Sequence, residues 1–99
     1  MVEWSAPARD DLRAIYEYIA LDSPFYARTT VRNIVERAAK VSDTPEIGRI
    51  VPELGEEKIR EVFIFSYRII YQLFPDRVTV LTVVHGYRDL QAEYIPVIR

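Results

Sequence analysis

The side chains best suited to chemistry are basic residues in the C-terminal part of the chain. Between Lys58 and Arg88 they number five against two acidic residues, although the 99-residue chain carries a net charge of −2. Guanidinium and ammonium groups bind carboxylates and phosphates through charge-assisted hydrogen bonds. This concentration of positive charge therefore predicts a surface that meets an anionic partner. The five residues are Lys58, Arg60, Arg68, Arg77 and Arg88.

Arg68 is the most informative of these cations because its neighbours are strand-like and apolar. It lies in the segment from Tyr67 to Leu73, whose other side chains, apart from Gln72, are aromatic or aliphatic. Successive side chains of a strand point to opposite faces. We therefore expect the face with Tyr67 and Leu73 to pack on helices, and Arg68 to open onto the exposed face. A mid-strand charge must be exposed or paired, which favours a role in catalysis or partner binding.

The other candidates also have simpler explanations. His85 ends a predicted strand, and it could be a general acid or base, because its pKa lies near neutrality, or a structural residue. Lys58 and Arg60 could protect a strand edge from aggregation. Arg88 could form a surface ion pair with the acidic residue that follows it, and Tyr94 could be a packing residue.

The composition excludes several kinds of site. The chain has no Cys, which rules out a disulfide framework, a thiolate zinc site and a cysteine nucleophile. It has a single His and no glycine-rich phosphate loop, so we expect no metal and no cofactor. No apolar run approaches the length of a transmembrane helix, and no signal-like segment is visible, which predicts a cytoplasmic protein. With an isoelectric point near 5.4, only a local patch could bind nucleic acid.

Hydrophobic periodicity divides the chain into a helical half and a strand-rich half. Ser5 before Pro7 and Ser23 before Pro24 are start signals for two helices, and the short link between them predicts an antiparallel hairpin. The second half alternates with a period of two and is rich in Val, Ile, Phe and Tyr. The predicted elements are a strand at 2–5, helices at 6–21 and 24–42, a connecting loop at 43–57 with room for one helical turn, antiparallel strands at 58–65, 66–74 and 77–85, and a tail at 86–99.

The order β-α-α-β-β-β predicts one domain, residues 1–99, of the α+β class with two layers. The helix hairpin, about 6–42, would pack on one face of an antiparallel sheet at 58–85. The other face would be left for solvent or a partner.

Five short motifs, each weak alone, together resemble a known family. They are the DL-xx-I-xx-YI pattern from Asp11 to Ile19 followed by Ser23-Pro24, the segment from Pro45 to Leu54, Ile59-Arg60-Glu61, YRIIY from Tyr67 to Tyr71, and HGYRDL from His85 to Leu90. In this order they resemble the RelE/ParE superfamily of toxins from type II toxin–antitoxin pairs, also known as plasmid stabilization proteins. The resemblance covers nearly the whole chain, and it implies the two-layer β-α-α-β-β-β fold.

The resemblance implies one of two actions. RelE-like members cleave messenger RNA in the ribosome, whereas ParE-like members poison DNA gyrase and cut nothing themselves. If the chain is an endoribonuclease, Lys58 and Arg60 would favour nucleophile formation. Arg68 and Arg88 would then clamp the scissile phosphate, and Arg88 or Tyr94 would give acid–base help.

Three observations favour the ParE-like action. Glu61 lies beside Arg60 and would repel a phosphate. The spacing from Lys58 to Arg68 is one residue longer than in the RelE pattern, and the acidic balance suits ribosomal RNA poorly. A third interpretation remains open, in which the chain only binds an antitoxin and is no longer toxic.

All three interpretations imply an antitoxin encoded in the same operon and a hetero-oligomer with it. We expect that partner in a groove over Arg68 and the C-terminal strand, held by strand addition or by a helix in the groove. The target would be DNA gyrase, or the ribosome with its mRNA, and no membrane is implied. The residues expected to bind the partner are Arg68, His85, Tyr87 and Arg88.

Overall fold

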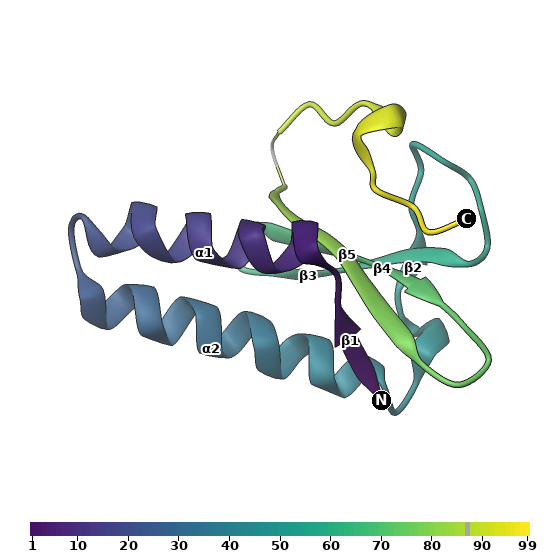
Figure 1. The fold of residues 1–99 in the computed structure, drawn as a ribbon, viewed down its shortest axis with the longest axis horizontal. Helices are drawn as coiled ribbons and strands as arrows, with labels where there is room; N and C mark the ends of the chain where they lie inside the picture. Colours follow the sequence, from purple (N-terminus) through teal and green to yellow (C-terminus); the bar gives the residue numbers. More distant parts are fainter. Residues whose placement is uncertain (87) are drawn as a thin grey trace.

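The computed structural model describes residues 1–86 and 88–99, and its elements follow the predicted order (Figure 1). Helices α1 (Ala6–Ala20) and α2 (Pro24–Val41) form the hairpin. Each follows a serine whose side chain accepts a backbone N–H, and each has a proline in its first turn. None of the described helices is long and apolar enough to cross a membrane. The other elements are strands β1 (Val2–Trp4), β2 (Arg49–Ile50), β3 (Ile59–Ile64), β4 (Tyr67–Leu73) and β5 (Val78–His85), and short 3-10 helices η1 (Pro45–Ile47) and η2 (Ala92–Tyr94).

The sheet is mixed rather than wholly antiparallel as expected. Its strand order is β1-β5-β4-β3-β2, and all neighbours are antiparallel except β1, which runs parallel to β5 with Val2 opposite Val78. Short links oblige β3, β4 and β5 to be antiparallel neighbours. The long connection from β1 through the helices places no such limit on its direction.

Two short stretches differ from the predicted elements. Strand β2 lies within the predicted loop 43–57 and pairs Arg49 with Glu61 of β3. Phe65 and Ser66, expected at strand ends, form the turn between β3 and β4 instead. Phe65 adopts a left-handed backbone conformation with φ of 52°.

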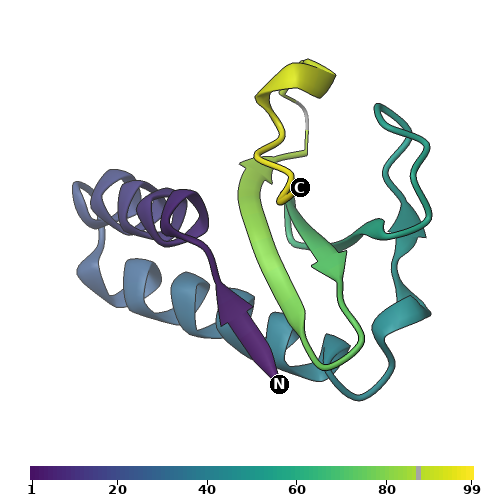
Figure 2. The same cartoon turned by 45° about the vertical axis from the view of Figure 1, so that its right-hand side comes forward.

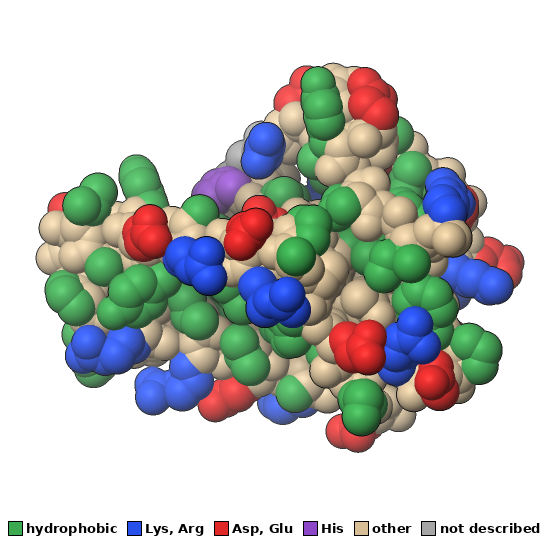
Figure 3. All heavy atoms as spheres, in the orientation of Figure 1, with side chains coloured by type: hydrophobic (Ala, Val, Ile, Leu, Met, Phe, Trp, Pro, Cys, Tyr) green, Lys and Arg blue, Asp and Glu red, His purple; other side chains and the backbone are tan. Residues whose placement is uncertain are grey.

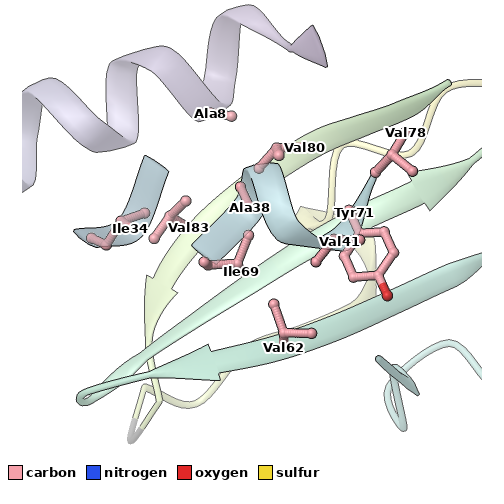
Figure 4. Packing of buried hydrophobic residues seen from close by; sticks show 10 residues of the cluster. All are labelled: Ala8, Ile34, Ala38, Val41, Val62, Ile69, Tyr71, Val78, Val80 and Val83. Atoms are coloured by element: carbon pink, nitrogen blue, oxygen red, sulfur yellow. The ribbon is translucent and has the colours of Figure 1, made fainter. Parts of the chain in front are cut away.

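The main core lies between the helix hairpin and one face of the sheet. Figure 4 shows alanine and branched aliphatic residues of the helices facing branched and aromatic residues of the strands. Tyr67 and Leu73 pack at its margin, which confirms the predicted inward face of β4. The buried members are Ala8, Ile34, Ala38, Val41, Val62, Ile69, Tyr71, Val78, Val80 and Val83.

The opposite face of the sheet carries a second core, so the expectation of an open face was wrong. Ile70 and Leu81 are fully buried there, under the segment 51–54 and the tail after β5. Figure 2 shows the tail on the side of the sheet away from the helices. The side-chain amide of Gln72 holds it, donating to the carbonyl of Ile98 at 2.8 Å and accepting from its N–H at 2.9 Å. Both covering segments are irregular, so hydrophobic periodicity in the sequence could not predict that they cover this face.

Candidate functional site

An open cleft of about 360 Å³ lies between α1 and the C-terminal end of β5. It combines an apolar wall with two phenols, a carboxylate, an imidazole and a guanidinium. The predicted partner-binding residues His85 and Arg88 lie here together, whereas Tyr87 is outside the described residues. The cleft is lined by Asp11, Ala14, Ile15, Tyr18, Tyr67, Val83, Val84, His85 and Arg88.

Asp11 builds the wall of this cleft. Its carboxylate accepts hydrogen bonds from the backbone N–H of Val83 at 3.0 Å and from the hydroxyl of Thr82. Strand β1 pairs with β5 only as far as Val80. Asp11 therefore accepts a hydrogen bond from a backbone N–H of β5 that β1 is too short to reach, and this bond holds α1 against the edge of β5.

The inner part of the cleft is aromatic. Tyr67 and His85 are cross-strand partners, and their rings meet edge to face with centroids 5.7 Å apart. Burial raises the pKa of Tyr67, and the nearby Tyr18 adds to the effect. Tyr67 therefore stays protonated at neutral pH, where it can donate a hydrogen bond but cannot serve as a base. His85 and Arg88 are exposed at the mouth of the cleft.

On the opposite face of the sheet, Arg68 is enclosed by two carboxylates. Its two terminal nitrogens donate to the two oxygens of Glu53 at 2.9 and 2.8 Å, and its Nε donates to Glu61 at 2.6 Å. Glu61 also accepts from the Nε of Arg49. The side chains of Arg68 and Glu61 are 6% and 0% exposed. The four residues form a chain of alternating charges that is buried at its centre.

This arrangement corrects the predicted exposure of Arg68 and the antitoxin groove expected above it. The arginine does lie on the face opposite the hairpin, but that face is covered and its charge is balanced. The hydrogen bonds with Glu53 raise the pKa of Arg68 despite its burial, and the same bonds lower the pKa of Glu53. The pair is therefore ionised at neutral pH. An incoming phosphate would have to displace Glu53 to reach the guanidinium.

The remaining residues of the predicted catalytic set are dispersed. Lys58 lines a different cleft, beside the turn after β4. Arg60 donates to three backbone carbonyls, at 2.7, 3.1 and 3.4 Å. Tyr94 is 70% exposed on η2, and only Arg88 lines the cleft beside α1. Within the described part of the chain, the five predicted residues therefore share no common cleft.

Three contributing residues were not identified as site residues in the sequence. Asp11 and Tyr18 belong to a family-like motif, yet nothing local places them against β5, more than sixty positions later. Tyr18 is 76% exposed in the structure, a property that its sequence position did not indicate. Glu53 was one of several acidic residues in a loop. No cluster of three or more metal-ligating side chains occurs among the residues that the structure describes.

Comparisons with known proteins agree with this architecture. A family model described as the ParE toxin of the type II toxin–antitoxin system parDE matches residues 2–90. No curated protein sequence matches the chain.

Two solved structures show the same fold. The chromosomal ParDE toxin–antitoxin system from P. aeruginosa has a TM-score of 0.69 and 22% identity, covering 85% of this chain and 92% of that chain. The RelBE2 toxin–antitoxin complex from Mycobacterium tuberculosis has a TM-score of 0.63 and 21% identity, covering 86% and 95%. Because the family model spans nearly the whole sequence, the chain belongs to the ParE toxin family of type II toxin–antitoxin systems, within the RelE/ParE superfamily.

Proposed function

We propose that this toxin inhibits growth by a ParE-like action on DNA gyrase and that an antitoxin from the same operon neutralises it. The contact of Arg68 with Glu53 and Glu61 carries this proposal. It occupies the guanidinium that a RelE-like ribonuclease would offer to the scissile phosphate. The match to a ParE family model supports the same choice. Poisoning gyrase needs no catalytic group on this chain and would take place in the cytoplasm.

The α1/β5 cleft is the proposed antitoxin site. Both similar solved structures are toxin–antitoxin systems, which supports such a partner. Ile15 and Val83 give the cleft an apolar wall, and His85 and Arg88 lie at its margin. This combination fits a segment with apolar residues and at least one carboxylate. Arg68, expected to take part, lies on the other face of the sheet.

A ribosome-dependent endoribonuclease remains the second candidate because of one observation. The same cleft brings an imidazole, a guanidinium and a protonated phenol together at His85, Arg88 and Tyr67. Cleavage of RNA needs a base for the 2′-hydroxyl, a cation for the phosphate and an acid for the leaving oxygen. In that case the active residues would differ from the predicted set, with Arg88 alone in common.

The two candidates are separated by brief induction of the toxin in cells. Primer extension across an abundant message reports RNA cleavage, and plasmid supercoiling with the DNA-damage response reports gyrase poisoning. We expect intact messages with relaxed or cleaved DNA. Discrete cuts in the message with normal supercoiling would contradict the proposal and favour the ribonuclease. Healthy growth with neither effect would indicate an antitoxin-binding protein that is no longer toxic.

The antitoxin site is tested by co-purification with the product of the neighbouring gene. The variant Ala14→Asp places a carboxylate at an exposed position in the cleft, so we expect it to abolish the complex. Ala39→Asp makes the same exchange at an exposed position of α2 outside the cleft and should leave the complex intact. Equal loss with both variants would place the antitoxin elsewhere.

A further inference from the structure

The end of the hairpin at which α1 joins α2 carries a surface of exposed apolar side chains. Figure 1 shows this end projecting beyond the sheet. Figure 3 shows apolar side chains gathered at the same end of the molecule, with charged side chains of both signs near them. We call the four large apolar residues there the hairpin-tip patch. They are Tyr18, Leu21, Phe25 and Tyr26, with exposed fractions of 76%, 83%, 64% and 65%.

Helix geometry explains why these side chains point away from the core. Tyr18 and Leu21 are three positions apart at the end of α1, so they are neighbours on its surface. Phe25 is two positions, or about 200° around the helix, from Ala27, which is fully buried. The rings of Phe25 and Tyr26 meet edge to face with centroids 5.9 Å apart. This contact limits the motion of both rings, so less conformational entropy is lost when a partner covers them.

The area of the patch is large enough for a protein–protein contact. A buried aromatic side chain covers roughly 150–250 Å². Weighted by their exposed fractions, the four side chains offer on the order of 500 Å² of apolar surface. Continuous apolar surface of that size on a soluble protein marks an interaction site. Two such patches, together with their polar margins, would bury about 1,200 Å², which is the lower range of stable interfaces.

The charges around the patch favour a second copy of the chain as the partner. Glu17 and Asp22 are exposed on the α1 side, and Arg28 is exposed on α2, one turn after Phe25. Among the described residues, none of these three charged side chains takes part in an ion pair. A two-fold interface repeats every contact, so the acidic side of one copy can face Arg28 of the other. An anionic lipid surface would instead repel Glu17 and Asp22.

We propose that two copies of this chain associate through the hairpin-tip patch, with its apolar side chains at the centre of a two-fold interface and the charges at its margin. The interface is small, so we expect a dissociation constant on the order of 10 μM. Tyr18 also lines the α1/β5 cleft, so the dimer and the proposed antitoxin complex use one side chain in common. The dimer is therefore assigned to the free toxin. This inference does not depend on the proposed action on gyrase.

The test is sedimentation velocity of the purified chain without antitoxin, between about 1 and 200 μM. The variant Phe25→Glu places a carboxylate in the patch. A negative charge is favourable in the first turn of a helix, so α2 should remain intact. The matched control Phe65→Glu makes the same exchange at an aromatic residue of similar exposure, 67%, in the turn between β3 and β4. Circular dichroism verifies that both variants remain folded.

We expect the parent chain to dimerise and Phe25→Glu to raise the dissociation constant roughly tenfold or more, because the substitution occurs twice in the interface. The control should stay within about threefold of the parent. A parent chain that is monomeric over the whole range would overturn the proposal. So would equal weakening in both variants, which would report only net charge. A monomeric chain whose binding to lipid vesicles or to the antitoxin is lost in Phe25→Glu would assign the patch to that partner instead.

Crosslinking locates the contact without adding a charge, and it applies even if Phe25→Glu does not fold. The chain has no Cys, so Leu21→Cys introduces a single thiol into the patch. Phe65→Cys introduces one at the control position. With a short bismaleimide reagent, we expect Leu21→Cys to give a covalent dimer and Phe65→Cys to remain a monomer. Equal crosslinking of both variants, or of neither, would overturn the proposal.

Discussion

Glu53 and Arg68 meet through two parallel hydrogen bonds of 2.9 and 2.8 Å, although 15 positions separate them in the chain. This two-pronged geometry is the one that arginine also uses to bind phosphate. Here it ties the irregular segment after β2 to the middle of the sheet. The arginine thus has a structural use that its position in a family-like motif did not suggest.

Replacing Arg68 by Ala should destabilise the fold by about 3–5 kcal/mol, because Glu61, which is 0% exposed, loses its buried partner. Urea unfolding at neutral pH measures this change. The exposed Arg88→Ala variant serves as the control and should unfold near the parent midpoint. A folded and stable Arg68→Ala variant that has lost toxicity would instead support a catalytic arginine.

The contact between Glu53 and Arg68 should also make stability depend on pH. The hydrogen bonds from Arg68 lower the pKa of Glu53 below its usual 4.5 in the folded protein. The contribution of this pair is therefore fully present above pH 4.5 and is lost as the pH falls through the lowered folded pKa. Urea unfolding from neutral to acidic pH should show the stability gap between the parent and Glu53→Gln narrowing in that range. Parallel curves for the parent and Glu53→Gln would contradict the assignment.

Gly48 should tolerate no side chain. A Cβ atom there would lie 2.4 Å from the hydroxyl of Tyr71 and 2.6 Å from the carbonyl of Glu61. We expect Gly48→Ala to cost about 1–3 kcal/mol of unfolding free energy. The hydroxyl of Tyr71 also accepts from the N–H of Gly48 at 2.9 Å and donates to the carbonyl of Pro45 at 2.7 Å. Tyr71→Phe should therefore destabilise on its own by about 1–3 kcal/mol.

A double-mutant cycle of these two substitutions tests the clash directly. The double variant should lose less stability than the sum of the single variants, because the hydroxyl that crowds the new methyl group is gone. Strict additivity would show that crowding by Tyr71 is absent and that the backbone contact alone matters.

Phe65→Gly should raise stability by roughly 1 kcal/mol, because a left-handed backbone strains every residue with a Cβ. Phe65 has a φ of 52° and its side chain is 67% exposed, so little packing is lost. Thermal unfolding compares this variant with Phe65→Ala, which removes the ring but keeps the strain. An equal gain in both variants would assign the effect to the ring. A stabilised Phe65→Gly protein without toxicity would show that the strained aromatic residue serves partner binding.

Local signals explain why the elements could be predicted from the sequence. Ser23 and Pro24 mark a helix start through capping chemistry that needs only neighbouring residues. The alternation along β4 assigned Arg68 to the face opposite Tyr67, and the structure confirms this assignment. The environment of Arg68 could not be predicted, because Glu53 and the tail reach it from irregular segments. The cleft beside α1 was missed for a similar reason, since Tyr18 and His85 come from opposite ends of the chain.

The bond from Asp11 to the backbone of Val83 spans 72 positions, which bears on how the chain folds. The helix hairpin and the β3–β4–β5 meander close through short turns and can form early. Bringing α1 against β5 instead closes a loop whose entropy cost is about 4 kcal/mol before any contact repays it. We therefore expect the packing of the helix hairpin on the β3–β4–β5 meander to limit the refolding rate, because contacts between residues far apart in sequence form slowly. The chain therefore reaches its native structure only after α1 has packed against β5.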